Sequence, residues 1–195
     1  MEKNDARLMR QVRSCGTNFQ TREDGGPVIE GYFAVFNSNY ELWPNASEQV
    51  APGAFRETLG GDIRALSDHD TRLVLGRTTA GTLSLREDDK GLFGTIKINE
   101  QDGDAMNLYA RVQRGDVDQC SFGFDIKRET FVDLGDGKCR WEIEEVDPLY
   151  EVSVCTFPAY TETSVSARKQ DLAEIEKRRA EAWRSDMKKK LGGTQ

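Results

Sequence analysis

The sequence predicts a mainly β domain of the α+β class. Two observations carry this prediction: short runs rich in β-branched and aromatic residues begin at residue 28, and turn signals separate them. The chain has 195 residues, enough for one domain of ordinary size and too few for two large ones. Such a domain buries about 70% of its extended-chain surface, so it needs no disulfide or metal to fold.

The strand segments predict two hairpins and one further strand. The first hairpin covers residues 81–98, where the DKG turn joins GTLSLRED to LFGTIKI. The second covers residues 119–146, where the GDGK turn joins QCSFGFDIKRETFVDL to CRWEIEEV. The segment LYEVSVCTF predicts a last strand, which Pro158 ends because proline cannot donate to a strand ladder.

Three segments show helical signals. PGAFRETLG has a proline near its start and a glycine at its end, and DGDAMNLYARVQRG runs from an aspartate cap to a glycine. From residue 164 to residue 191, strong helix formers and i,i+4 charge pairs predict a charged helix with a thin apolar face. The first residues are polar and lack periodicity. We therefore expect a flexible N-terminal arm (1–26), a β domain (27–163) and a charged C-terminal helix and tail (164–195).

The composition argues against several classes of function. The net charge of −7 disfavours a nucleic-acid or anionic membrane partner, and the chain lacks a run of about 18 apolar residues that would span a membrane. The four cysteines form no CxxC pair, so we expect no metal site and no cofactor. Because the start of the chain lacks the apolar stretch of a signal peptide, we expect a cytosolic protein with reduced thiols.

One histidine and one serine form a candidate hydrolytic pair. His69, the only histidine, lies in LSDHDTRLVLGR, and histidine is the usual base that activates a serine. In CSFGFDI, alternation of strand side chains is expected to turn the apolar residues to the core and Ser121 outward, beside Gly123. A solvated histidine and a serine on the polar face of a strand are the alternative interpretations.

A carboxylate near this pair would orient the histidine. In LYEVSVCTF, the tyrosine and the first two valines are expected on the apolar face, which leaves Glu151 and Ser153 on the other. If this strand lies near that of Ser121, Glu151 reaches the same face and can orient His69. A solvated glutamate on a strand is the alternative interpretation.

Six segments of the chain occur in an order that resembles a known family. They are GYFAVFN, PGAFRETL, ALSDHDTRLVLGRT, GTLSLREDDKGLFGTI, SFGF and YEVSVCTFPAY, within residues 28–166. Together they resemble the prohead (capsid maturation) serine proteases of tailed bacteriophages, which are related to the herpesvirus assemblins. The resemblance implies a small closed, mostly antiparallel β-barrel flanked by helices, with the active site on its outer wall.

The resemblance also implies roles for the candidate residues. His69 matches the general base, Ser121 the nucleophile and Glu151 the third member of a catalytic triad. The related assemblins use a second histidine in the third position, but this chain has no second histidine. Asp147 and Glu145 are therefore rival candidates for that position.

The function implied by the resemblance is that of a serine endopeptidase in phage capsid maturation. Its substrates would be the scaffold protein or the scaffold-like segment of the major capsid protein, inside the procapsid in the host cytoplasm. It would then cut itself, with the C-terminal helix as one candidate segment. A homodimer is expected by analogy, and no nucleic-acid or membrane partner is expected.

Two alternatives remain at this point. The chain could be a catalytically inert capsid-assembly or scaffolding protein on the same fold. It could also be a cysteine hydrolase that uses Cys120 or Cys155, although alternation predicts that Cys120 is buried in the core.

Overall fold

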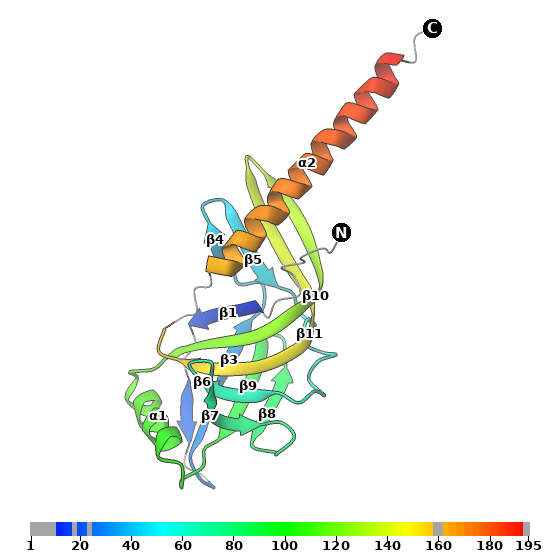
Figure 1. The fold of residues 1–195 in the computed structure, drawn as a ribbon. Coiled ribbons are helices and arrows are strands. Elements are labelled where there is room, and N and C mark those ends of the chain that lie inside the picture. The colour runs from blue at the N-terminus through cyan, green and yellow to red at the C-terminus, as the bar shows by residue number, and fades with distance from the viewer. Residues whose placement is uncertain (1–10, 17–18, 23–24, 158–161, 193–195) are drawn as a thin grey trace. The chain divides into compact units, whose positions relative to one another are not determined.

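Two β-sheets hold the strands of the computed structural model, which describes residues 11–16, 19–22, 25–157 and 162–192 (Figure 1). Within these ranges the larger sheet has seven strands: β1 (Gln11–Gly16), β4 (Tyr40–Trp43), β5 (Ala46–Val50), β6 (Arg64–Ser67), β7 (Asp70–Arg77), β10 (Gln119–Gly135) and β11 (Lys138–Cys155). The smaller sheet has four: β2 (Gln20–Arg22), β3 (Val28–Val35), β8 (Leu83–Glu87) and β9 (Gly91–Lys97).

The strand order leaves both sheets open. The larger sheet runs β1-β10-β11-β5-β4, and the β6–β7 hairpin joins it where β6 pairs in parallel with the end of β11. The smaller sheet runs β2-β3-β9-β8 and is antiparallel throughout. The mainly β prediction is confirmed. The prediction of a closed barrel is wrong, because no ladder among the described strands joins one sheet to the other.

Side chains join the two sheets instead of a backbone ladder. Where β10 approaches β3, the Cys120 thiol donates to the carbonyl oxygens of Tyr32 (3.2 Å) and Phe33 (3.5 Å). One face of the β10–β11 pair belongs to the shared core. Its core residues are buried with those of β3 and β9, and they include Phe33, Ile96, Phe122, Phe124, Val152 and Val154. Because side chains alternate along a strand, burial of this face also determines which side chains of β10 and β11 lie on the opposite face.

The two predicted hairpins are present, as β8–β9 and β10–β11. The predicted last strand is not separate, because residues 149–155 continue β11. Register shifts between Gly123 and Glu129 on β10 bend the pair. Tyr150, expected on the apolar face, is therefore 38% exposed, and its hydroxyl donates to the Asp125 carboxylate at 2.6 Å.

Helix α1 (Gly103–Arg114) forms where it was predicted. The carboxylate of Asp102 caps its first turn, and Gly115 ends it in the left-handed conformation (φ 83°). The predicted helix at residues 52–60 is wrong, because this segment forms consecutive turns with bonds such as Thr58 N–H to Phe55 O (3.1 Å). Gly53 in that segment has a φ of 92°, which a right-handed helix does not permit.

The chain has two compact units, residues 1–160 and residues 161–195, and helix α2 (Glu162–Gly192) lies in the second. Ion pairs at i,i+4 spacing join Glu174 to Arg178 (2.6 Å) and Asp186 to Lys190 (2.8 Å) along it. Neither helix in the described ranges is long and apolar enough to cross a membrane.

The N-terminal segment departs from the expected flexible arm at two places. Residues 11–16 form β1 against β10, and residues 20–22 form β2 against β3. The prediction of flexibility does not hold for these two strands. Residues 1–10 of the expected arm lie outside the described residues.

Candidate active site

Ser121 and Glu151 lie on the face of the β10–β11 pair that is turned away from the core. The antiparallel register places Ser121 opposite Ser153 and Gly123 opposite Glu151. Directly opposed residues share a face, so the alternation expected from the sequence is observed. The expected exposure is wrong: Ser121 is 0% exposed and Glu151 2% exposed. The site is therefore a buried polar face within the domain.

His69 reaches this face from the turn between β6 and β7. Because β6 pairs in parallel with β11, its end lies beside Val154, and the Asp68 N–H donates to the Val154 carbonyl at 3.0 Å. Asp68 and His69 both have positive φ values, 47° and 61°, as the two central residues of a type I′ turn do. The turn thus projects the imidazole over β11.

The Asp68 carboxylate fixes this turn. It accepts hydrogen bonds from the Thr156 N–H (2.8 Å) and from the Thr156 hydroxyl (3.3 Å). Aspartate tolerates the left-handed conformation better than most residues with a Cβ atom. The sequence reason for the position of His69 is therefore the residue before it.

Replacement of Asp68 by alanine is expected to lower the free energy of unfolding by about 1–2 kcal/mol, because alanine is strained at positive φ and accepts no hydrogen bond. Asp68→Asn keeps an oxygen acceptor and a residue type found at positive φ, so a smaller loss is expected. Urea unfolding of the two variants measures the difference. Equal losses would show that the turn does not depend on this side chain.

The imidazole of His69 contacts the buried carboxylate. Nδ1 of His69 lies 2.9 Å from Oε1 of Glu151, and the two side chains are 23% and 3% exposed. With the Glu151 carboxylate ionised, it accepts the Nδ1 proton and leaves Nε2 as the nitrogen that can accept a proton. This arrangement matches the orientation of a general base by a carboxylate.

Ser153 is a polar residue of this site that sequence reasoning did not assign to the reaction. Its hydroxyl donates to Oε2 of Glu151 at 2.5 Å and accepts the backbone N–H of His69 at 3.3 Å. The side chain is fully buried. Ser153 therefore ties the carboxylate to the turn that carries the histidine. Its place two residues after Glu151 on the same strand face was the available sequence signal.

Ser121 is bonded to a different partner in this structure. Its hydroxyl donates to the carbonyl oxygen of Arg13 on β1 at 2.8 Å. Among the described residues, no hydrogen bond joins Ser121 to His69, and His69 Nε2 instead lies 3.9 Å from the Cys155 sulfur. The serine, the histidine and the glutamate thus share one face, with the serine one strand away from the histidine–glutamate pair.

The rival carboxylates lie elsewhere. Glu145 and Asp147 contact the ammonium of Lys127 at 2.7 Å and 3.4 Å. These carboxylates raise the pKa of Lys127 through hydrogen bonds and charge. Glu151 is therefore the carboxylate that the described structure brings to His69.

The cysteines have environments that disfavour a thiolate nucleophile. Burial, followed by the nearby Asp68 and Glu151, raises the pKa of Cys155 to about 12. Cys120 is fully buried in the core, as alternation predicted. The thiolate is the reactive form of cysteine, so a group with a pKa this high is unreactive at neutral pH. In the described residues, no group of three or more metal-ligating side chains comes together.

Iodoacetamide at pH 8 is therefore expected to leave Cys155 of the folded protein unmodified while a small free thiol is consumed. The rate should rise roughly tenfold per pH unit below the pKa of about 12, because the thiolate fraction does so. Peptide mass mapping measures the modification, with guanidinium-unfolded protein as the positive control. Fast labelling of Cys155 with loss of activity would favour the cysteine hydrolase.

A buried carboxylate–histidine pair on the same sheet face as a serine is the combination of side chains that serine hydrolases use. The sequence model of the caudovirus prohead serine protease family matches residues 16–178, and the chain belongs to this family.

The chain is similar to known phage proteases. The prohead protease of Enterobacteria phage HK97 is 30% identical over 146 residues, which cover 73% of this chain and 60% of the HK97 protein. The chain thus spans 60% of the length of this curated relative. Among solved structures, the bacteriophage T4 capsid assembly protease, gp21, superposes with a TM-score of 0.46 at 12% identity, over 75% of this chain and 97% of that one.

Proposed function

We propose that the chain is a serine endopeptidase of phage capsid maturation. The observation that carries the proposal is the 2.9 Å contact between His69 Nδ1 and the buried Glu151 carboxylate, on the face that also holds Ser121. Membership of the prohead serine protease family supports the same reaction. The pair supplies an oriented base, and Ser121 supplies a hydroxyl on the neighbouring strand.

In the proposed reaction Ser121 attacks the carbonyl carbon of a peptide bond. His69 Nε2 takes the hydroxyl proton and returns it to the leaving amine, while Glu151 holds the Nδ1 proton and stabilises the imidazolium. The Ser121 hydroxyl must turn from the Arg13 carbonyl toward His69 for this transfer. Catalytic hydrogen bonds are often absent or long in structures without substrate and form only in the reacting complex.

The proposed substrates are the scaffold protein or the scaffold-like segment of the major capsid protein, followed by the chain itself. The HK97 relative is named a prohead protease, which agrees with a place inside the assembling procapsid. The homodimer, the host-cytoplasm location and self-cleavage in the C-terminal helix stay predictions.

The test is the intact mass, over time, of wild type and Ser121→Ala, each alone and with the capsid-protein precursor. Fragments with wild type alone support the endopeptidase. Equal cutting by both would remove Ser121 from the reaction. No cutting by either would favour the inert assembly protein, an alternative that the bond between Ser121 and the Arg13 carbonyl keeps open. Ser84→Ala, at an exposed serine of β8, is the matched control.

A further inference from the structure

Strand β1 lies on the larger sheet as a bound peptide would. It forms one end of the sheet and pairs antiparallel with β10, from Gln11 opposite Phe124 to Gly16 opposite Gln119. The register sets Ser14 opposite Ser121. Addition of an extended peptide to a sheet edge is a common mode of peptide recognition, because the backbone ladder supplies binding without sequence demands.

The contact between Ser121 and β1 brings the hydroxyl to a peptide bond. Ser121 Oγ lies 2.8 Å from the carbonyl oxygen of Arg13, the carbonyl of the Arg13–Ser14 bond. Because a carbonyl bond is about 1.23 Å long, the carbonyl carbon lies within about 4 Å of Oγ. Reacting atoms in near-attack arrangements lie about 3–3.5 Å apart, so a small movement suffices.

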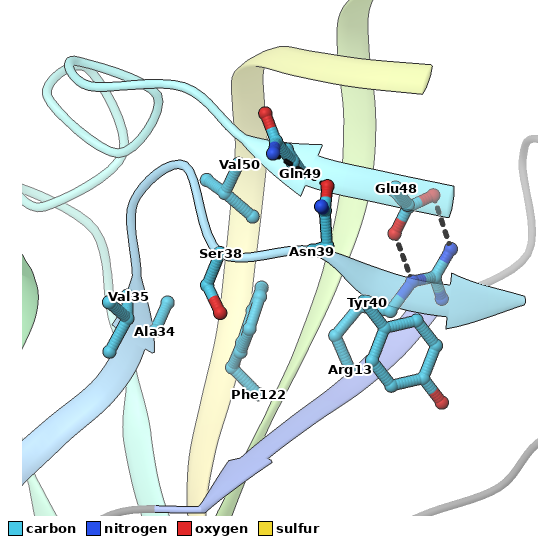
Figure 2. Close-up of a pocket in the computed structure, with 10 residues that line it drawn as sticks. All are labelled: Arg13, Ala34, Val35, Ser38, Asn39, Tyr40, Glu48, Gln49, Val50 and Phe122. Atoms are coloured by element: carbon cyan, nitrogen blue, oxygen red, sulfur yellow. Dashed lines mark hydrogen bonds and ion pairs between the residues drawn. The ribbon is translucent and has the colours of Figure 1, made fainter. Parts of the chain in front are cut away.

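The side chain of Arg13 sits in a pocket that fits a cation. Its guanidinium contacts both carboxylate oxygens of Glu48 on β5, with Nη2 at 2.9 Å from Oε2 and Nε against Oε1. Figure 2 shows this pair as two dashed lines, with the side chains facing each other beside Tyr40. The side chains of Arg13 and Glu48 are 4% and 1% exposed. A fork of two hydrogen bonds is the geometry that guanidinium and carboxylate prefer.

Glu48 gives this pocket its selectivity. A buried carboxylate without a cation is costly, so the site favours a peptide that brings a positive charge to this point. A cavity of about 330 Å³ lies beside the pair, and its lining includes Ser38, Asn39, Gln49 and Phe122. Phe122 and the paired Arg13 share the core-side face of the sheet, so the cavity lies on the face that holds the Arg13 guanidinium, opposite the face of Ser121.

We infer that β1 is bound as the enzyme's own substrate, that the Arg13–Ser14 bond is a self-cleavage site, and that Glu48 selects an arginine or lysine immediately before the cut. The inference rests on the proposed function. Other substrates would bind to the edge of β10 in the same way, with a basic side chain against Glu48.

The covalent steps balance within these residues and water. Ser121 Oγ bonds to the Arg13 carbonyl carbon, its proton passes through His69 to the Ser14 nitrogen, and the carbon–nitrogen bond breaks. Water then attacks the ester on Ser121 and passes a proton through His69 back to Oγ. The products are a peptide that ends in the Arg13 carboxylate and a chain that begins at Ser14.

The first test maps the cut sites of purified full-length protein by intact mass and N-terminal sequencing, with wild type and Ser121→Ala in parallel. A product that begins at Ser14 in wild type alone supports the inference. Cutting of the capsid-protein precursor without a cut after Arg13 would overturn the inference and leave the proposed function standing. No cutting of chain or precursor would overturn both.

The second test addresses the pocket. Glu48→Gln is expected to slow the cut after Arg13 on the order of 100-fold, because one partner of a buried charge pair is lost. Glu41→Gln, at an exposed position of the neighbouring β4, is the matched control and should cut at the wild-type rate. Equal rates for both variants would overturn the role of Glu48.

A charge swap keeps the test valid if Glu48→Gln folds poorly. Arg13→Glu combined with Glu48→Arg restores a pair of reversed sign, and the cut after position 13 should return, whereas Arg13→Glu alone should not be cut there.

A synthetic peptide of residues 11–20, QVRSCGTNFQ, should be cut after Arg13 by the wild type, and the same peptide with Arg13→Gln about 100-fold more slowly. Equal cutting of the two peptides would overturn the selectivity.

Discussion

Ser121→Ala is expected to lower the rate of peptide-bond cleavage by about a millionfold, the loss seen when the serine of a Ser–His pair is removed in subtilisin. Two buried serines lie opposite each other on this face, Ser121 and Ser153, so the comparison between them matters. The Ser153 hydroxyl donates to Glu151 and faces Nδ1 of His69 at 3.3 Å, the nitrogen already bonded to the carboxylate. A nucleophile must instead give its proton to the open nitrogen, Nε2.

Ser153→Ala is therefore expected to lower the cleavage rate only about 10- to 100-fold, because it removes one hydrogen bond to a charged group. Single-turnover rates on the capsid-protein precursor measure both variants, and circular dichroism confirms that they fold. A larger loss for Ser153→Ala than for Ser121→Ala would reverse the two roles.

The parts of the fold that local sequence determines were predicted. The turns DKG and GDGK join strands that pair directly, and the capping of α1 by Asp102 involves neighbours in the chain. The face of β10 on which Ser121 lies was also predicted, because the apolar side chains of Phe122 and Phe124 have to face the core. In each case the information lies within a few residues of the feature.

The parts that depend on distant partners were not predicted. Arg13 in the polar segment QVRSCG is buried only because Glu48, 35 residues along, meets its guanidinium. No periodicity marks such a pair, so a flexible arm was expected there. Closure of the barrel was inferred from resemblance, and it fails because the Cys120 thiol and core side chains, rather than a ladder, join β10 to β3.

The candidate site was likewise predicted where the signal is local and missed where it depends on distant residues. The sequence predicted the strand face of Ser121 and Glu151 but not their burial. Alternation shows which face of the strand a side chain is on, and it does not show whether another part of the chain covers that face. The contact between His69 and Glu151 joins residues 82 apart in sequence and requires the parallel pairing of β6 with β11. That pairing has no local signal.

Glu151→Gln is expected to lower turnover by about 10⁴-fold with the fold retained, as the equivalent carboxylate-to-amide change does in trypsin-type proteases. The amide has nearly the same shape, so it keeps a contact with Ser153. However, an amide that presents its N–H₂ group to His69 favours the tautomer with the proton on Nε2, and this tautomer cannot accept the Ser121 proton. Glu145→Gln and Asp147→Asn, which alter the carboxylates that contact Lys127, are the matched controls and should keep full activity.

Glu151→Asp separates this positioning role from a loss of packing. It restores the negative charge on a shorter side chain, so it should recover part of the turnover that Glu151→Gln loses, because a carboxylate again accepts the Nδ1 proton of His69. Single-turnover rates of the two variants on the same precursor measure the difference. Turnover of Glu151→Gln near that of wild type would give the third role to another group.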